Sequence, residues 1–267
     1  MYILLSNDDG VQSAGLLALR QALGVLGEVA VVAPERNWSA GSHSRTLFAP
    51  LRATPTTLAD GSPALACDGT PADCVGLALL GLLERRPDLI VSGINHGPNL
   101  AHDVLYSGTV AAAMEGLVVG IPSIAVSLVG GYKPDADFTA AAHWATKIAA
   151  LAIAHKLPGD MLLNINVPAG SADAITQAQV TRLGQRIYRD ELVMRHDPRG
   201  RPYYWIGGHA PEGRLDEGTD LGAIAAGKVS ITPLHFDLTS TAWLDRLQTI
   251  GWNGNEGLGA RGNRTLG

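Results

Sequence analysis

Cysteine, aromatic residues and clustered basic charge are scarce in this chain of 267 residues. The two cysteines, Cys67 and Cys74, do not form a C-x-x-C pair, which disfavours both a disulfide framework and a cysteine-rich metal site. Free cysteines in a core are typical of a reducing compartment, so we expect a cytoplasmic protein. The 20 lysines and arginines are outnumbered by 25 acidic residues and are scattered along the chain. This excludes the basic surface that binds duplex nucleic acid.

Long hydrophobic runs are also missing. Glycine, proline or a charged residue interrupts each apolar stretch well before the roughly 18 residues that cross a bilayer, so no membrane association is expected. The first residues lack the basic and apolar segments of a secretory leader, and none is expected. Apolar residues make up 46% of the chain and charged ones 17%, which excludes a disordered chain and indicates a folded one.

Several motifs of nucleotide-binding proteins and hydrolases are absent. The first strand is followed by Asn7-Asp8-Asp9-Gly10-Val11, where a dinucleotide-binding domain has G-x-G-x-x-G. We find no Walker A loop and no G-x-S-x-G elbow between a strand and a helix. Asp8 and Asp9 are adjacent, unlike the Asp-x-Asp pair of aspartyl-phosphate phosphatases. These absences exclude the common dinucleotide, P-loop and serine-hydrolase chemistries.

Strand and helix patterns alternate through the first two-thirds of the chain. Short apolar runs predict buried strands, and leucines or alanines at helical spacing predict the helices between them. This alternation predicts a three-layer, Rossmann-like α/β fold with a mainly parallel sheet and helices on both faces. The predicted strands are 2–6, 29–33, 88–93, 123–127 and 161–167, and the predicted helices are 15–23, 72–84, 110–119 and 137–155.

The pattern changes after Pro168. Residues 187–195 and 203–206 flank a turn-forming stretch and predict a long hairpin. A short helix capped by Thr219, a strand near 229–232 and a helix near 240–249 follow. We therefore expect a core at 1–175, a C-terminal part at 176–250 whose projecting hairpin serves oligomer contacts, and a flexible, glycine-rich tail at 251–267.

Oxygen-bearing side chains follow successive predicted strands. Asp8 and Asp9 follow the first strand, Ser39 lies in the loop after the second, and Asn95 follows the strand at 88–93. The carboxyl ends of parallel strands share one edge of the sheet, so these residues are expected to meet. Such oxygen donors suit Mg²⁺ or Mn²⁺. Taken singly, each also fits a turn or cap that satisfies its own backbone.

Ser107-Gly108-Thr109 opens a predicted helix at the same edge and offers hydroxyls, backbone N–H groups and the positive helix end. A cation beside such an anion cradle predicts phosphoester hydrolysis by a metal-activated water. Ser107 also fits a plain helix cap. The spacing of His43, His96 and His102 disfavours zinc. Proton donation to the leaving group by His96 or His102 stays open.

These motifs together resemble the SurE (survival protein SurE) family. The resemblance extends over nearly the whole chain up to the tail. It is carried by Ser6-Asn7-Asp8-Asp9-Gly10, by Pro34-Glu35-Arg36-Asn37 with Ser39, by Ser92-Gly93-Ile94-Asn95 with Gly97 and Asn99, by residues 106–116 (YSGTVAAAMEG), and by Ile231-Thr232-Pro233-Leu234.

The resemblance implies a metal-dependent nucleoside 5′-monophosphate phosphohydrolase with some activity on 3′-nucleotides and short polyphosphate. One divalent cation, Mg²⁺ or Mn²⁺, is expected per subunit, and Asp8 or Asp9 is expected to accept a proton from the attacking water. The family also implies a homodimer or homotetramer that exchanges the C-terminal hairpin and helix. By the family pattern, the metal ligands are Asp8, Asp9, Ser39 and Asn95, and the phosphate contacts are Asn99, Ser107, Gly108 and Thr109.

Two departures from the family pattern flank the expected site. Trp38 stands where a small or polar residue is common, and Ala101-His102 stands where members often carry glycine and a polar or acidic residue. Neither replaces an expected ligand, so they bear on substrate preference. Two alternatives remain open, namely a nucleotide-sensing module without turnover and a general sugar-phosphate phosphatase.

Overall fold

The computed structural model describes residues 1–133, 135–188, 190–208 and 212–250. The chain divides into two compact units, Met1–Leu234 and His235–Gly267. The described part of the second unit contains the amphipathic helix α6 (Thr241–Gln248). The tail predicted at 251–267 lies outside the described residues. Within the described ranges, no helix is long and apolar enough to cross a membrane.

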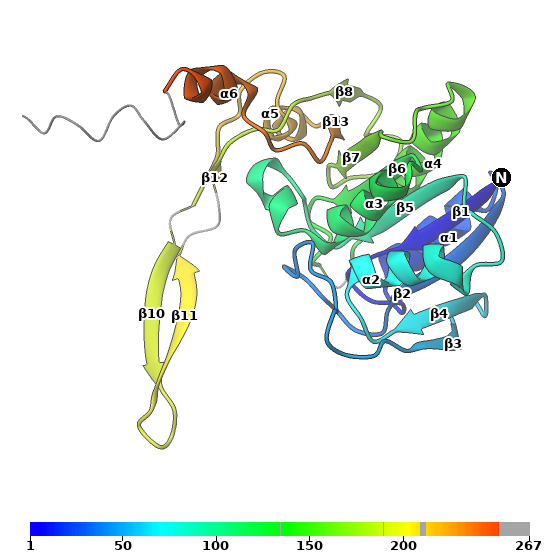
Figure 1. Ribbon diagram of the computed structural model, residues 1–267, viewed down its shortest axis with the longest axis horizontal. Coiled ribbons are helices and arrows are strands. Elements are labelled where there is room, and N and C mark those ends of the chain that lie inside the picture. Colours follow the sequence, from blue (N-terminus) through cyan, green and yellow to red (C-terminus); the bar gives the residue numbers. More distant parts are fainter. Residues whose placement is uncertain (134, 189, 209–211, 251–267) are drawn as a thin grey trace, which may run out of the picture. The chain divides into compact units, whose positions relative to one another are not determined.

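A nine-stranded sheet forms the centre of the first unit (Figure 1). In spatial order its strands are β3 (Ala53–Thr57), β4 (Pro63–Cys67), β2 (Glu28–Pro34), β1 (Tyr2–Ser6), β5 (Leu89–Asn95), β6 (Ser123–Leu128), β7 (Leu162–Val167), β13 (Val229–Leu234) and β8 (Ala178–Val180). The strands from β4 to β7 in this order are parallel. Strands β3 and β13 run antiparallel to β4 and β7. The predicted Rossmann-like, mainly parallel α/β fold is confirmed.

Helices cover both faces of the sheet (Figure 1). Helices α1 (Ala14–Leu23) and α4 (Thr139–Ala154) pack on one face, and α2 (Pro71–Leu77) and α3 (Gly108–Val119) pack on the other. Strand β1 is buried along its whole length because its side chains alternate between the two layers. Ile3 and Leu5 join the first cluster and Leu4 joins the second. This two-sided burial explains the continuous apolar sequence of the strand.

Side-chain caps begin the helices that lie next to the expected site. The Ser13 hydroxyl accepts the N–H of Leu16 at 3.3 Å and starts α1 just after the Asp-Asp turn. Thr70 and Asp73 form a reciprocal capping box at α2, with Pro71 in the first turn. Ser107 caps α3. Because these caps satisfy otherwise unpaired N–H groups, they fix where each helix begins.

Two predicted boundaries were wrong. The helix expected to extend to Glu84 leaves the α conformation after Leu77, continues as a π-helical turn at Ala78–Leu82 and ends where Gly81 adopts φ 141°. Asn95 is the last residue of β5 and does not follow the strand. The loop after it contains a short 3-10 helix, Ala101–Leu105. The spacing of apolar residues does not predict where this helix and this strand end, because the glycine conformation and the strand pairing decide those positions.

The C-terminal part of the first unit contains the predicted hairpin. Strands β10 (Asp190–His196) and β11 (Pro202–Gly208) pair antiparallel, and the side chains of Leu192, Trp205 and Ile206 are exposed. Short strands β9 (Arg186–Ile187) and β12 (Glu212–Gly213) pair at its base. Helix α5 (Asp220–Ala225) is capped by Thr219, as the sequence predicts. The use of this hairpin in oligomer contacts stays a prediction.

Candidate active site

An open cleft of about 220 Å³ lies at the carboxyl edge of the sheet. We call it the carboxyl-edge cleft. It brings together five of the eight residues that the sequence singled out. Asp9, Gly108 and Thr109 do not line it and lie next to residues that do. The lining consists of Asp8, Ser39, Ala40, Asn95, Pro98, Asn99, Asp103, Tyr106, Ser107, Tyr132 and Tyr188.

Asp8 follows β1 and is only 3% exposed. The Thr109 hydroxyl, at the start of α3, donates to its Oδ1 atom. Burial raises the pKa of Asp8 to about 6, and the neighbouring charge of Asp9 adds to this, while the hydrogen bonds from Thr109 oppose it. The Asp8 carboxylate is therefore an anion held in the protein without full compensation of its charge.

Asp9 connects two loops at the same edge. Its carboxylate accepts the backbone N–H of His96 at 3.1 Å and the side-chain amide of Asn37 at 3.4 Å. Burial raises the pKa of Asp9, against the opposing influence of His96. Among the described residues, no lysine or arginine forms an ion pair with Asp8 or Asp9. Two adjacent carboxylates without a lysine or arginine partner are a donor set that fits a hard divalent cation.

Ser39 and Asn95 supply neutral oxygens from two further loops or strands. Ser39 is exposed and its loop is fixed to the site because the N–H of the preceding Trp38 donates to the Asp8 carbonyl at 2.8 Å. Asn95 is 8% exposed and donates its side-chain amide to the Gly97 carbonyl at 2.8 Å. Both residues face the same cleft as Asp8. The four expected ligands therefore lie at one edge of the sheet, and three of them, Asp8, Ser39 and Asn95, line the cleft.

The loop that carries Asn99 is held by asparagines that the sequence reasoning missed. Asn166 accepts the Asn99 N–H at 2.8 Å, and Asn164 and Asn166 donate to the Asn99 carbonyl at 2.9 and 3.0 Å. The Asn99 side chain donates to Ser127 at 2.7 Å. Asn164 and Asn166 are fully buried in β7. Two asparagines inside an otherwise apolar strand are the signal that could have identified them.

The start of α3 forms the other side of the cleft. The Ser107 hydroxyl accepts the N–H of Val110 at 3.0 Å, so the interpretation of Ser107 as a helix cap is confirmed. A side chain at Gly108 would place its Cβ 2.7 Å from the Cβ of Asp8, so only glycine allows this approach. The hydroxyl of Thr109 is already bonded to Asp8. Gly108 and Thr109 can therefore reach a ligand only through their backbone N–H groups.

The three histidines considered for metal binding do not converge. The Nε2 atom of His43 lies 2.6 Å from Glu115 Oε1, and the ring centroids of His96 and Phe138 are 4.9 Å apart. His102 is exposed. In the part of the chain that the structure describes, no group of three or more His, Cys, Asp and Glu residues is placed to hold a metal. The candidate cation site instead combines two carboxylates with hydroxyl and amide oxygens.

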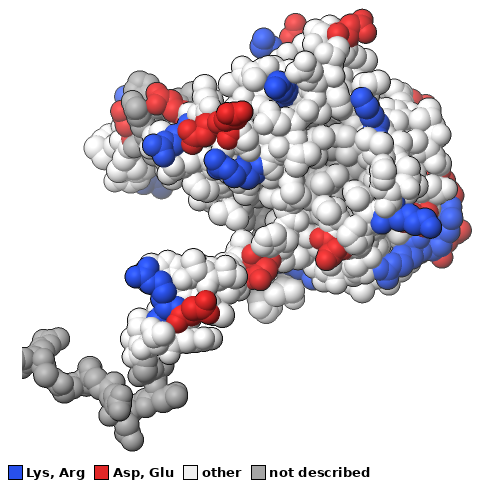
Figure 2. Space-filling model, turned by 90° about the horizontal axis from the view of Figure 1, so that it is seen from above, with Lys and Arg blue, Asp and Glu red and all other residues white. Residues whose placement is uncertain are grey.

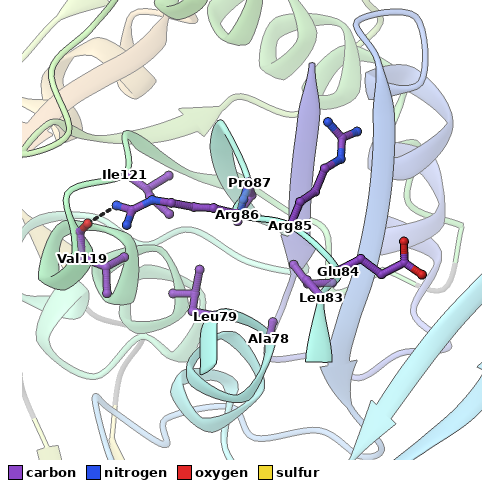
Figure 3. Close-up of a pocket in the computed structure, with 9 residues that line it drawn as sticks. All are labelled: Ala78, Leu79, Leu83, Glu84, Arg85, Arg86, Pro87, Val119 and Ile121. Carbon is purple, nitrogen blue, oxygen red and sulfur yellow. Dashed lines mark hydrogen bonds between the residues drawn. The ribbon is translucent and has the colours of Figure 1, made fainter. Parts of the chain in front are cut away.

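A second cavity, of about 240 Å³, lies beside the π-helical turn that follows α2 (Figure 3). Its two arginines already have partners, because Arg86 donates to the Val119 carbonyl and Arg85 pairs with Glu28 at 2.6 Å. The lining contains one acidic side chain, Glu84. The cavity thus lacks the adjacent carboxylates, Asp8 and Asp9, that are found at the carboxyl-edge cleft, and we retain that cleft as the candidate active site.

Charged side chains are interspersed on the face shown in Figure 2, and much of that face carries none. The carboxyl-edge cleft itself has no lysine, arginine or histidine among its described lining residues. An anionic substrate would therefore depend on a bound cation and on the start of α3 for its attraction.

Comparison with known proteins identifies the family. The family model "Survival protein SurE" matches residues 3–190. A curated relative named 5′-nucleotidase SurE, from Herpetosiphon aurantiacus, is 72% identical over 95% of this chain and 99% of its own length. One of the same name from Chloroflexus aggregans is 58% identical over 94% of this chain and 100% of its own length.

A solved structure shares the fold as well as the sequence. The crystal structure of the SurE protein from Aquifex aeolicus superposes with a TM-score of 0.79 at 41% identity. The match covers 93% of this chain and 99% of the Aquifex chain. On the family model, the relatives and this structure together, the chain belongs to the SurE family.

Proposed function

We propose that this chain is a nucleoside 5′-monophosphate phosphohydrolase that acts in the carboxyl-edge cleft. The observation that carries the proposal is a pair of adjacent carboxylates, the buried Asp8 and the half-buried Asp9, which has no lysine or arginine partner among the described residues and lies next to the start of a helix in a SurE-family chain. Relatives up to 72% identical bear the name 5′-nucleotidase SurE. The enzyme is metal-dependent, and it acts in the cytoplasm as a homodimer or homotetramer.

Asp8, Asp9, Ser39 and Asn95 would hold one Mg²⁺ or Mn²⁺ ion per subunit. Support comes from the donor set, which is all oxygen, and from the raised pKa values that burial gives to both carboxylates. When bound, the cation supplies charge that polarises the phosphoryl oxygens and lowers the pKa of a water ligand. Because the hydroxyl and amide donors are neutral, the charge of one divalent cation would be balanced by the two carboxylates, and the net charge of the site would be close to zero.

The phosphate lies between this site and the start of α3. Asn99 and Ser107 contact it with their side chains, and Gly108 and Thr109 contact it through backbone N–H groups and the positive helix end. Asp8 or Asp9 would accept the proton that the attacking water releases as its oxygen bonds to phosphorus, while the bond from phosphorus to the nucleoside oxygen breaks and that oxygen takes up a proton. The loop around Asn99 is fixed by β7, so the phosphate contacts are held in place before substrate binds.

Phosphate release from a substrate panel tests the function. We expect AMP and other nucleoside 5′-monophosphates to be hydrolysed, with lower rates for 3′-AMP and short polyphosphate. Release of phosphate from none of these substrates, combined with tight, metal-independent AMP binding by calorimetry, would identify a nucleotide-sensing module instead.

Thr109 is expected to affect activity through its hydrogen bond to Asp8. Thr109→Val keeps the shape of a fully buried side chain but removes the hydroxyl that orients the carboxylate. We expect kcat/KM for AMP to fall by roughly 10- to 100-fold, the range for partners that orient metal ligands. Thr109→Ser keeps the hydroxyl and should retain most activity. Equal losses in the two variants would show that packing, and not the hydrogen bond, is what the site requires.

A further inference from the structure

Three tyrosines are among the residues that line the carboxyl-edge cleft. The chain has six tyrosines, and Tyr106, Tyr132 and Tyr188 all line this one cleft. Their exposed fractions are 59%, 76% and 41%, so their rings are not used to fill the core. We call these residues the aromatic rim. Exposed aromatic rings gathered beside a polar cleft indicate a binding role.

The structure holds the residues of the aromatic rim in place. The Tyr188 hydroxyl donates to Asp103 Oδ1 at 2.7 Å, and Arg186 donates to the other oxygen of Asp103 at 2.8 Å. The N–H of Tyr106 donates to the Asp103 carbonyl at 3.0 Å, directly before the helix start at Ser107. One acidic residue therefore links two residues of the rim. The Tyr188 ring and the Tyr106 backbone are therefore held in place before any ligand binds.

Tyr132 reaches the cleft from the turn after β6 and lies against Gly97. A Cβ atom built on Gly97 would be 2.2 Å from the Tyr132 hydroxyl, so the phenol end packs directly on the backbone of the loop between Asn95 and Asn99. Burial and then the charges of Asp9, Asp8 and Asp103 raise the pKa of Tyr132. The ring thus rests with its hydroxyl end on this loop and leaves much of its face exposed.

The chemistry of the rim differs from that of the cleft floor. The floor offers carboxylate, amide and hydroxyl groups from Asp8, Asn95, Asn99 and Ser107. On the rim, Asp103 has both oxygens engaged by Tyr188 and Arg186. The exposed lining residues that remain for a leaving group are the three tyrosines with Ser39 and Ala40, so most of the exposed apolar surface there is aromatic. Stacking on such surface accepts any flat base, because every base has a π face.

We infer that the aromatic rim binds the base of the nucleotide by stacking, and thereby favours nucleotides over phosphate monoesters without a base. The inference rests on the proposed function and specifies its substrate class. It assigns the phosphate to the floor and the base to Tyr132, Tyr106 and Tyr188. Stacking contacts the π face of the base and makes no hydrogen bonds to its edge, so purine and pyrimidine nucleotides should be hydrolysed at comparable rates.

The ratio of kcat/KM for AMP to kcat/KM for ribose 5-phosphate tests this inference, because the two substrates differ by the base. Replacing the ring in Tyr132→Leu should lower this ratio by roughly 5- to 150-fold, the range for one base–aromatic stack. Tyr132→Phe keeps the ring and should keep the ratio. Tyr106→Leu provides a second, independent loss of a ring. UMP should give a ratio similar to that of AMP in the parent protein.

Phe48→Leu is the matched control. Phe48 is fully exposed and does not line the cleft, so its loss should leave the ratio unchanged. Thermal unfolding of each variant checks that the fold is retained.

Three results would overturn the inference. In the first, Tyr132→Leu and Tyr106→Leu change both substrates equally. In the second, they alter the mass in solution without altering the ratio, which would make the rim a contact between copies of the chain. In the third, the parent hydrolyses both substrates equally well; this result overturns the inference about the rim but not the proposed function. A parent that hydrolyses neither substrate would overturn the proposed function itself.

Discussion

Replacing Asp8 by asparagine is expected to lower kcat/KM for AMP by more than about 100-fold, because partners that only orient metal ligands already cost up to that much. The change removes one charge and almost no volume, and the Thr109 hydroxyl can still donate to the amide oxygen. The loss would therefore come from the missing charge and not from repacking. Asp9→Asn is expected to give a loss of the same order.

The same substitution should not destabilise the metal-free protein. Burial raises the pKa of Asp8 from 3.8 to about 6, so the unfolded chain binds this proton less readily and stability falls as pH rises between these values. At neutral pH the buried charge then costs on the order of 3 kcal/mol. Asparagine removes that cost, so Asp8→Asn is expected to unfold at the same or a higher denaturant concentration in the presence of a chelator.

Asp160→Asn is a suitable control, because Asp160 is exposed and lies next to β7 at the end remote from the cleft. It should change neither activity nor stability. Asp8→Asn protein with near-parental turnover would contradict the assignment of Asp8 as a ligand. A strongly destabilised Asp8→Asn variant would show that the carboxylate has a structural role.

Removal of divalent metal is the second change with a large expected effect. Chelation should lower AMP hydrolysis by more than about 100-fold, because no basic side chain lines the cleft in the described residues and the carboxylates would repel the phosphate. Mg²⁺ or Mn²⁺ should restore the rate. Full activity after exhaustive chelation, verified by metal analysis, would refute the metal-dependent mechanism.

Bound metal should also raise the free energy of unfolding, by an amount that grows with the metal concentration relative to its dissociation constant. A ligand at 100 times its dissociation constant adds about 2.7 kcal/mol to the free energy of unfolding. The thermal midpoint of the parent is thus expected to rise with Mg²⁺ or Mn²⁺, while that of Asp8→Asn should rise little. Equal shifts in the two proteins would place the cation elsewhere. This measurement does not use activity, so it locates the ion independently of turnover.

Much of the fold could be predicted from local sequence. The run Tyr2–Ser6 is apolar on both faces, and the structure places it between helices on both sides. Ser107 and Thr219 were recognised as helix starts because a cap is a local interaction between neighbours. The end of the helix after Leu77 was missed, since a glycine conformation and not a break in apolar spacing ends it.

The candidate site could be predicted in part, because topology brings the carboxyl ends of parallel strands to one edge. That rule places Asp8, Ser39 and Asn95 at a common cleft. It says nothing about Tyr132 and Tyr188, which come from a turn and from the segment that leads to the hairpin. Nor does it predict that Asn164 and Asn166 hold Asn99, because they belong to a different strand.

The sequence by itself determined the alternation of elements, the helix caps and which edge of the sheet carries the acidic turn. Tertiary structure alone decided that Thr109 bonds Asp8 across 101 residues, that the Asp9 carboxylate accepts the His96 N–H, and that three tyrosines share the cleft. The physical reason is the sequence separation between the interacting residues. Apolar spacing and capping act within a few residues, whereas contacts between distant segments form only when the packing of the whole sheet and its helices brings those segments together.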